Sequence, residues 1–119
     1  MKEFKGRTAF VTGAASGLAM ARTFLDRGMN VMMADVEQAA LDKAFHSLSN
    51  HGDRVAKVLA DVSIGEAFTE AAQTAFRTFG KVHILCNNAG VSRGGAVEEI
   101  SMADWEWVVG VNLYGTVHG

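Results

Sequence analysis

The chain has 119 residues, of which 49% are hydrophobic and 20% charged, a balance that suits one folded domain with a buried core. Its net charge of -2 comes from scattered acidic and basic residues, so the sequence gives no support to nucleic-acid binding. One cysteine, four histidines without metal-ligand spacing and no long apolar run argue against a disulfide, a metal centre and a membrane span. We therefore expect a single-domain cytoplasmic protein that binds neither nucleic acid nor membrane.

Short apolar runs alternate with amphipathic stretches through the first half of the chain. Residues 8–11 predict a strand, and residues 18–27 predict a helix whose apolar side chains fall on one face. Residues 31–34 are apolar throughout, which is typical of a strand covered on both faces. Apolar residues at helical spacing between Leu41 and Leu48 indicate a second helix.

The same alternation continues in the second half. Residues 55–60 predict a third strand, and the capping-box spacing of residues 63–66 predicts the start of a third helix. Residues 82–86 predict a fourth buried strand, and a glycine-rich loop follows over about residues 87–96. Ser101 is the expected cap of a last helix, which we expect to be partly buried through Val108, Val109 and Leu113.

Strands and helices that alternate through short connections indicate βαβ units and a parallel sheet. Right-handed crossovers would order the strands 3-2-1-4, so the predicted fold class is α/β, a Rossmann-like doubly wound sheet with helices on both faces. The last helix is still running at Gly119, and we therefore expect residues 1–119 to be a domain that is incomplete at its C-terminus. The fourth strand would be an uncovered apolar edge, which favours association.

The turn between the first strand and the first helix carries two glycines. Gly13 permits a tight turn, and Gly17 lets the backbone approach a pyrophosphate at the helix N-terminus, where unpaired N–H groups favour an anion. Ala19 stands where a third glycine is commoner, a replacement that the dinucleotide-binding pattern allows. We expect Ser16 and Leu18 to lie at the pyrophosphate with the two glycines.

Asp35 ends the second strand, about 20 residues after Gly13, where dinucleotide-binding proteins place an acid. A carboxylate there accepts hydrogen bonds from the adenosine ribose and repels the extra phosphate of NADP. Neither the glycine turn nor the neighbourhood of Asp35 carries Lys or Arg, so NAD is the preferred cofactor. The alternative interpretation is that Gly13 and Asp35 merely form turns.

Four motifs resemble those of the short-chain dehydrogenases/reductases, in the same order and at the same places as in that family. The first is the glycine turn over Thr12–Ala19, and the second is Asp61-Val62 after the third strand. The third is Asn-Asn-Ala-Gly at residues 87–90, and the fourth is Val-Asn at residues 111–112. Because the motifs span the chain, it is identified as a member of this family, covering the N-terminal half only.

The resemblance implies an NAD(P)-binding Rossmann domain in an oxidoreductase that transfers a hydride between nicotinamide and a small carbonyl or secondary alcohol. It also implies a homo-oligomer, a dimer or a tetramer. The site residues that it implies are Asp61 and Val62 at the adenine ring, Asn88, Ala89 and Gly90 on the nicotinamide-ribose side, and Asn112 as the catalytic-tetrad residue holding a proton-relay water.

Several of these residues also allow a structural interpretation. Asn87 and Asn88 can satisfy backbone groups of their loop at the carboxyl edge of the sheet without any ligand. Asn112 can equally be a polar residue on the solvent side of its helix. We interpret His83 as a hydrogen-bonded core residue and Cys86 as a small core thiol that nothing nearby activates.

The family's reaction also uses a serine and a Tyr-x-x-x-Lys pair to pass a proton. In these 119 residues Tyr114 is the only tyrosine and Lys81 is the last lysine, so no such pair is present. Tyr114 and His118 have i, i+4 spacing, but we interpret Tyr114 as a core or interface aromatic. We therefore expect this chain alone to be inactive, and the alternative to an oxidoreductase is a non-catalytic dinucleotide-binding module or a truncated product without turnover.

Overall fold

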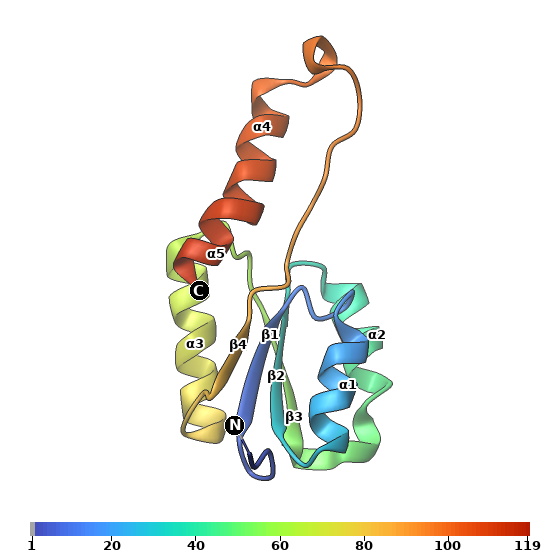
Figure 1. Cartoon of the computed structure of the whole chain (residues 1–119), viewed down its shortest axis with the longest axis vertical. Helices are drawn as coiled ribbons and strands as arrows, with labels where there is room; N and C mark the ends of the chain where they lie inside the picture. Colours follow the sequence, from blue (N-terminus) through green and yellow to red (C-terminus); the bar gives the residue numbers. More distant parts are fainter. Residues whose placement is uncertain (1) are drawn as a thin grey trace.

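The computed structural model describes residues 2–119, and within this range four parallel strands form one sheet (Figure 1). The strands are β1 (Thr8–Thr12), β2 (Asn30–Asp35), β3 (Val55–Leu59) and β4 (Ile84–Cys86). Their order across the sheet is β3-β2-β1-β4, which confirms the predicted doubly wound order. Because parallel strands end at one edge of the sheet, the four loops that follow them meet there and form the site.

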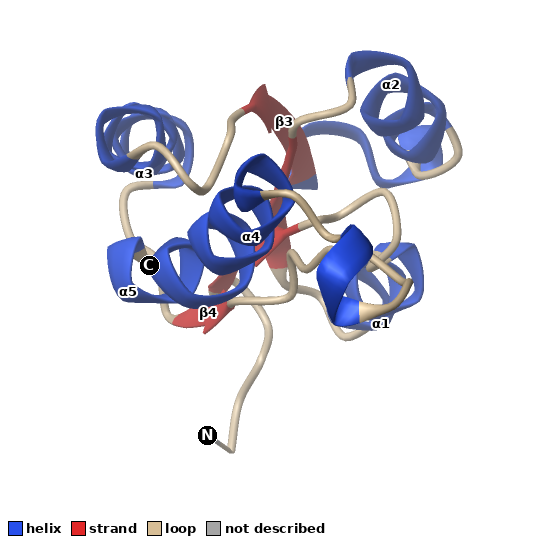
Figure 2. Cartoon of the chain, turned by 90° about the horizontal axis from the view of Figure 1, so that it is seen from above, coloured by secondary structure: helices blue, strands red, loops and turns tan. Residues whose placement is uncertain are grey.

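Helices cover both faces of the sheet (Figure 2). The helices α1 (Leu18–Asp26) and α2 (Gln38–His46) pack on one face, and α3 (Gly65–Phe79) packs on the other. A short 3-10 segment, η1 (Ser49–Arg54), leads from α2 into β3. The predicted alternation of strands and helices is therefore confirmed as far as β4.

The sheet divides the core into two clusters of buried side chains. On β2, Val31 and Met33 belong to the cluster beneath α1 and α2, while Met32 and Ala34 belong to the cluster beneath α3. Each of these four residues is at most 1% exposed. A strand that is covered on both faces needs apolar residues at every position, and this explains the unbroken apolar run.

Beyond β4 the chain leaves the sheet as an elongated extension (Figure 1). We call residues 2–86 the body and residues 87–119 the arm. The arm contains η2 (Val97–Glu99), α4 (Met102–Val109), a π-helical turn η3 (Gly110–Tyr114) and α5 (Gly115–His118). The molecule measures 49 × 26 × 25 Å, and its radius of gyration of 15.0 Å exceeds the roughly 13.5 Å of a compact chain of this length.

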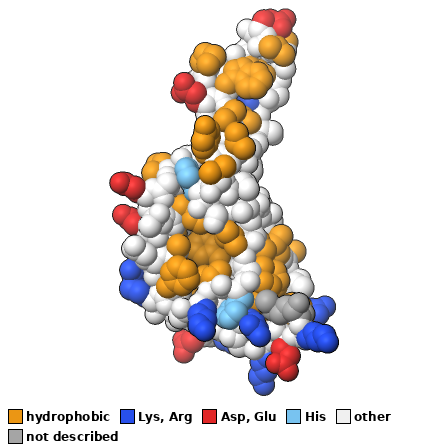
Figure 3. All heavy atoms as spheres, turned by 60° about the vertical axis from the view of Figure 1, so that its left-hand side comes forward, with side chains coloured by type: hydrophobic (Ala, Val, Ile, Leu, Met, Phe, Trp, Pro, Cys, Tyr) orange, Lys and Arg blue, Asp and Glu red, His pale blue; other side chains and the backbone are white. Residues whose placement is uncertain are grey.

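The expected partial burial of the last helix is confirmed only in part. Val108 is half-buried, but Val109 is 38% exposed, Leu113 is 56% exposed, and no residue of α4 is fully buried. The reason is that α4 projects past the edge of the sheet, and the arm packs on the body mainly through its last turns, where Gly115 is buried against Val62. Figure 3 shows the hydrophobic side chains that the arm leaves on the surface.

Two smaller predictions also differ from the structure. The strand β4 has three residues and is only partly buried, because it is an edge strand with a neighbour on one side. The helix α3 begins at Gly65 after Ile64, so Ser63 does not cap it. The cap at Ser101 is confirmed, because its hydroxyl oxygen accepts a hydrogen bond from the backbone N–H of Asp104 at 3.1 Å.

None of the helices in the part of the chain that the structure describes combines the length and the apolar character needed to cross a membrane.

Candidate functional site

A cleft of about 380 Å³ lies at the carboxyl edge of the sheet, between the body and the arm. Eight of the predicted site residues line it together, although they come from the ends of four different strands. These residues are Gly13, Ser16, Asp35, Asp61, Val62, Asn88, Ala89 and Gly90. Three predicted site residues are not on its lining, namely Gly17, Leu18 and Asn112.

The glycine turn is tight and lies directly against the loop that follows β4. Gly13 has φ of +60°, and a Cβ at this position would lie 2.8 Å from Cα of Ala89. A side chain is thus excluded both by the backbone conformation and by the close approach of a second backbone segment. Gly17 has an ordinary negative φ, but a Cβ there would lie 2.8 Å from Nδ2 of Asn88. The lack of side chains at Gly13 and Gly17 therefore leaves room for the loop that contains Asn88 and Ala89.

Thr12 and Asn88 join these two loops through hydrogen bonds. Thr12 is buried, at 2% exposed. Its hydroxyl accepts hydrogen bonds from the N–H groups of Asn88 and Ala89 at 3.0 Å each and donates one to the Cys86 carbonyl at 3.2 Å. The Asn88 amide donates to the carbonyls of Thr12 and Gly13 at 3.0 and 3.1 Å. The structural interpretation of Asn88 is therefore correct, and it holds alongside the position of Asn88 on the cleft.

The Asp35 carboxylate stands at the end of β2 and lines the cleft. One oxygen accepts from the backbone N–H of Ala15 at 3.0 Å, and the other accepts from the N–H of Glu37 at 3.0 Å. Asp35 therefore ties the glycine turn to the start of the β2–α2 connection. An ionised carboxylate has about four acceptor sites, so these two bonds leave capacity for a ligand.

The segment after β3 also lines the cleft, through Ala60, Asp61 and Val62. Asp61 accepts hydrogen bonds at Oδ1 from the N–H and the hydroxyl of Ser63, at 2.9 and 2.6 Å, and this fixes the turn before α3. Val62 is 8% exposed and belongs to the core cluster beneath α3. One ring nitrogen of His118, Nδ1, lies 2.7 Å from the Val62 carbonyl oxygen, so the end of the arm is fastened at this segment.

Asn112 lies in the π-helical turn η3 and pairs with the backbone of Val91. Its Oδ1 accepts from the Val91 N–H at 2.8 Å, and its Nδ2 donates to the Val91 carbonyl at 2.8 Å. Both polar groups of the side chain are thus occupied by the loop that follows β4. Single π-helical turns inside helices occur often at functional sites, and this turn carries the predicted catalytic asparagine.

Sequence reasoning missed several residues that line the same cleft: Val36, Glu37, Ala60, Val91, Trp107 and Val111. Val36, Ala60 and Val91 each adjoin a predicted position, so extending those motifs by one residue finds them, and Val111 already belongs to the Val-Asn motif. Glu37 and Trp107 had no such signal. Thr12 belongs to the glycine motif, but the role of its side chain depends on contacts with the loop after β4.

The remaining titratable residues that the sequence singled out stand outside the cleft lining. His83 accepts a hydrogen bond at Nδ1 from the Thr8 N–H at 3.0 Å, which confirms the predicted bond, but it is exposed rather than in the core. Burial raises the pKa of the Cys86 thiol, which disfavours its thiolate form. Tyr114 is 52% exposed and its ring lies 6.4 Å from that of His118, centroid to centroid.

The sequence comparisons decide the family. The family model described as short chain dehydrogenase matches residues 7–119. The chain belongs to the short-chain dehydrogenase family. This confirms the membership that the four motifs predicted.

The chain is similar over nearly its whole length to other short-chain dehydrogenases, both by sequence and by structure. It is 36% identical to the CLA biosynthesis dehydrogenase/reductase of Lactiplantibacillus plantarum, over 99% of this chain and 42% of that protein. It is 35% identical to the C alpha-dehydrogenase of a Sphingobium strain, over 100% of this chain and 40% of that protein. A short chain dehydrogenase/reductase from Burkholderia phymatum, crystallised in complex with NAD, superposes with a TM-score of 0.95 at 44% identity, over 100% of this chain and 43% of that one. The chain therefore spans about two fifths of the length of these relatives.

Proposed function

We propose that the cleft binds NAD or NADH and that the chain is the cofactor-binding part of an oxidoreductase acting on a small carbonyl or secondary alcohol. The observation that carries this proposal is the convergence of the glycine turn, Asp35 and the segment 61–62 on one cleft. A dinucleotide needs an anion site, an acceptor for ribose hydroxyls and an apolar wall for a base, and the cleft has all three. The family membership and the NAD complex of the Burkholderia relative support the same cofactor.

The pyrophosphate would lie at the N-terminus of α1. The first turn of this helix carries no acidic side chain to repel an anion, and its free N–H groups together with the helix dipole favour one. Ser16 is exposed and lines the cleft, so its hydroxyl is placed to donate to a phosphate oxygen. Gly13, Gly17 and Leu18 would border the pyrophosphate with their backbone, while Ala89 and Asn88 occupy the space beside the two glycines.

The adenosine would lie between Asp35 and the segment 61–62. Asp35 would accept from the ribose hydroxyls, and Asp61 with Val62 would border the adenine ring. Glu37 lines the cleft beside Asp35, so an additional ribose phosphate would meet two carboxylates. We therefore propose that NAD is preferred over NADP.

The other end of the dinucleotide would lie along Asn88, Ala89 and Gly90. The nicotinamide ring, when bound, supplies the position that gives or takes a hydride. Asn112 is our proposed contribution of this chain to the proton relay. Its own side chain is bonded to Val91, so it would act by holding the loop and the π-helical turn in place.

A second candidate function is that of a dinucleotide-binding module without turnover. The observation that favours it is the absence of a Tyr-x-x-x-Lys pair from these 119 residues, in which Tyr114 is the only tyrosine. We propose that the chain alone binds the cofactor and does not turn over substrate. An NADH-linked assay of the chain against secondary alcohols and ketones tests this, because measurable turnover would contradict it.

We also propose that the chain works in the cytoplasm and associates with itself. Val109, Leu113 and Val117 on the arm are 38%, 56% and 66% exposed, and β4 is an edge strand whose backbone groups are unpaired on one side. Light scattering over a range of concentrations measures the association. A chain that stays monomeric at high concentration would contradict this part of the proposal.

The experiment that tests the proposed cofactor site is a calorimetric titration of NADH into Asp35→Ala. Loss of a charge-assisted hydrogen-bond acceptor is expected to weaken binding by about 1.5–3 kcal/mol. Asp53→Ala is the matched control, because Asp53 is an exposed aspartate in η1 that does not line the cleft. Unchanged NADH affinity in Asp35→Ala, with the fold retained by circular dichroism, would rule out the proposed role of Asp35.

A further inference from the structure

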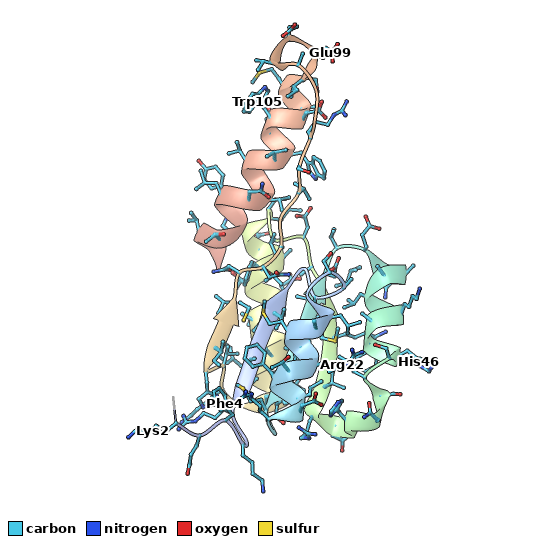
Figure 4. All side chains as sticks on the ribbon, turned by 45° about the vertical axis from the view of Figure 1, so that its right-hand side comes forward. Lys2, Phe4, Arg22, His46, Glu99 and Trp105 are labelled. Atoms are coloured by element: carbon cyan, nitrogen blue, oxygen red, sulfur yellow. The ribbon has the colours of Figure 1, made fainter. Side chains whose placement is uncertain are left out.

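Trp107 is a large aromatic side chain on the cleft to which the proposed roles assign nothing. It lies on α4, is 48% exposed and lines the cleft together with Val111. Trp105 is 46% exposed but lines a separate hollow of about 250 Å³ between α4 and the loop before it. Residues two apart on a helix point to nearly opposite sides, which explains why the two tryptophans line different hollows. Figure 4 labels Trp105 on the arm, above the sheet.

The packing of the arm places Trp107 at one particular end of the cleft. Val111 packs against the core cluster that contains Val62, and a Cβ on Gly115 would lie 2.7 Å from Cγ2 of Val62. The helix face that carries these residues is therefore seated on the segment after β3. Trp107 precedes Val111 by four residues, so it lies one turn further along this face. We therefore assign Trp107 to the end of the cleft that Asp61 and Val62 line.

We propose that the indole of Trp107 packs against the adenine ring of the cofactor. This contact is apolar, whereas the carboxylates beside the ribose would act by hydrogen bonding and charge. This inference rests on the proposed function, since it assigns one further residue of this chain to the same site. A half-exposed indole has a flat apolar surface to bury, and stacking on an aromatic side chain stabilises a purine base. On the ribose side the cleft is lined by Asp35, Val36 and Glu37, none of which is aromatic.

The two tryptophans give a direct optical test, because they are the only ones in the chain. Trp105→Phe leaves Trp107 as the single reporter, and Trp107→Phe leaves Trp105. The probe is ADP-ribose, which carries the adenosine and pyrophosphate but no nicotinamide that could accept excitation energy. ADP-ribose is expected to change the emission of Trp107 strongly and that of Trp105 little. Nicotinamide mononucleotide, the other half of the cofactor, is expected to change neither.

Affinity gives the second readout. Trp107→Ala is expected to bind ADP-ribose about tenfold more weakly than the unmodified chain. Trp107→Phe, which keeps an aromatic face, should stay within about threefold of it. Trp105→Ala is the matched control, equally exposed on the same helix, and should bind as the unmodified chain does. Circular dichroism verifies that each variant is folded, which is expected because no residue of α4 is buried.

The outcomes separate this inference from the function on which it rests. If the unmodified chain binds neither NADH nor ADP-ribose, the proposed function fails and takes the inference with it. If the chain binds both but Trp107→Ala binds ADP-ribose undiminished, only the assignment of Trp107 is overturned. A response of Trp107 to nicotinamide mononucleotide rather than to ADP-ribose would also overturn it, since the indole would then border the other end of the cofactor.

Discussion

The body and the arm contain similar proportions of hydrophobic residues but bury them to different extents. In the body, Leu25 is 1% exposed, and a cluster of buried side chains fills the space between the sheet and the helices on each face. In the arm, Leu113 is 56% exposed, and fixed points such as the Asn112–Val91 pair are polar. The candidate cleft lies where the two regions meet. One of its walls is therefore supported by a core, and the other is supported by a few hydrogen bonds and the contact of Gly115 with Val62.

The largest predicted effect is a loss of free energy of unfolding when a leucine of the body is truncated, compared with the same truncation in the arm. Leu25→Ala should lower the free energy of unfolding by about 3 kcal/mol, because it leaves a cavity in the packed core. Leu113→Ala removes the same atoms from an exposed site and should change it by less than about 0.5 kcal/mol. Urea unfolding followed by circular dichroism measures both. Equal losses would show that the arm is packed as tightly as the body.

A second prediction concerns the junction of the body with the loop after β4. Thr12→Val keeps the shape of the side chain but leaves the N–H groups of Asn88 and Ala89 without their acceptor. We expect a loss of about 2 kcal/mol in the free energy of unfolding. Thr8→Val is the control, because Thr8 is equally buried, at 1% exposed, at the other end of the same strand. A Thr12→Val chain no less stable than Thr8→Val would contradict the importance of this junction.

A third prediction is local to the arm. Asn112→Ala removes both hydrogen bonds to Val91, and a pair of exposed bonds of this kind stabilises a segment by about 1 kcal/mol. The amide of Val91 should then exchange with solvent about fivefold faster, while amides of β1 keep their protection. Hydrogen exchange measured by NMR reports the two regions separately. Faster exchange throughout β1 would mean that Asn112 supports the body as well as the loop.

The smallest effect should be the response of α4 to acid. The pKa of Asp104 is held below its ordinary value, first by hydrogen bonding with the Ser101 side chain, then by the Ser101 N–H and Arg93. Because the pKa is lower in the folded chain than in the unfolded one, the ionised carboxylate stabilises α4 at neutral pH, and this contribution disappears as pH falls through the folded-state pKa.

NMR titration of the Asp104 carboxyl measures this effect. Ser101→Ala should move the pKa of Asp104 back toward its ordinary value, and Ser63→Ala, a serine outside the arm, should leave it unchanged. An unmoved pKa in Ser101→Ala would contradict the capping box as its cause.

The body was predictable from the sequence because its strands, helices and turns are determined by patterns of neighbouring residues. The unbroken apolar run of β2 indicated a strand covered on both faces, and the glycine turn followed by Asp35 indicated a dinucleotide site at one edge. Eight of the predicted site residues share the cleft because motifs at the ends of parallel strands must converge there.

The arm and the finer contacts were not predictable in the same way. Val109 and Leu113 have helical spacing, but spacing does not say whether a second element covers that face, and here none of the described residues does. Trp107 reaches the cleft only because α4 crosses above the segment after β3. The role of Gly17 as space for Asn88 likewise depends on a contact between residues more than 70 positions apart.

The proposed preference of the cleft for NAD depends on the Asp35 side of its lining. Separate calorimetric titrations of NADH and NADPH into the unmodified chain measure this preference. We expect NADH to bind and NADPH to bind at least about tenfold more weakly, because its extra phosphate would face Asp35 and Glu37. Equal binding of the two, tighter binding of NADPH, or no binding of NADH by the folded chain would contradict the proposed preference.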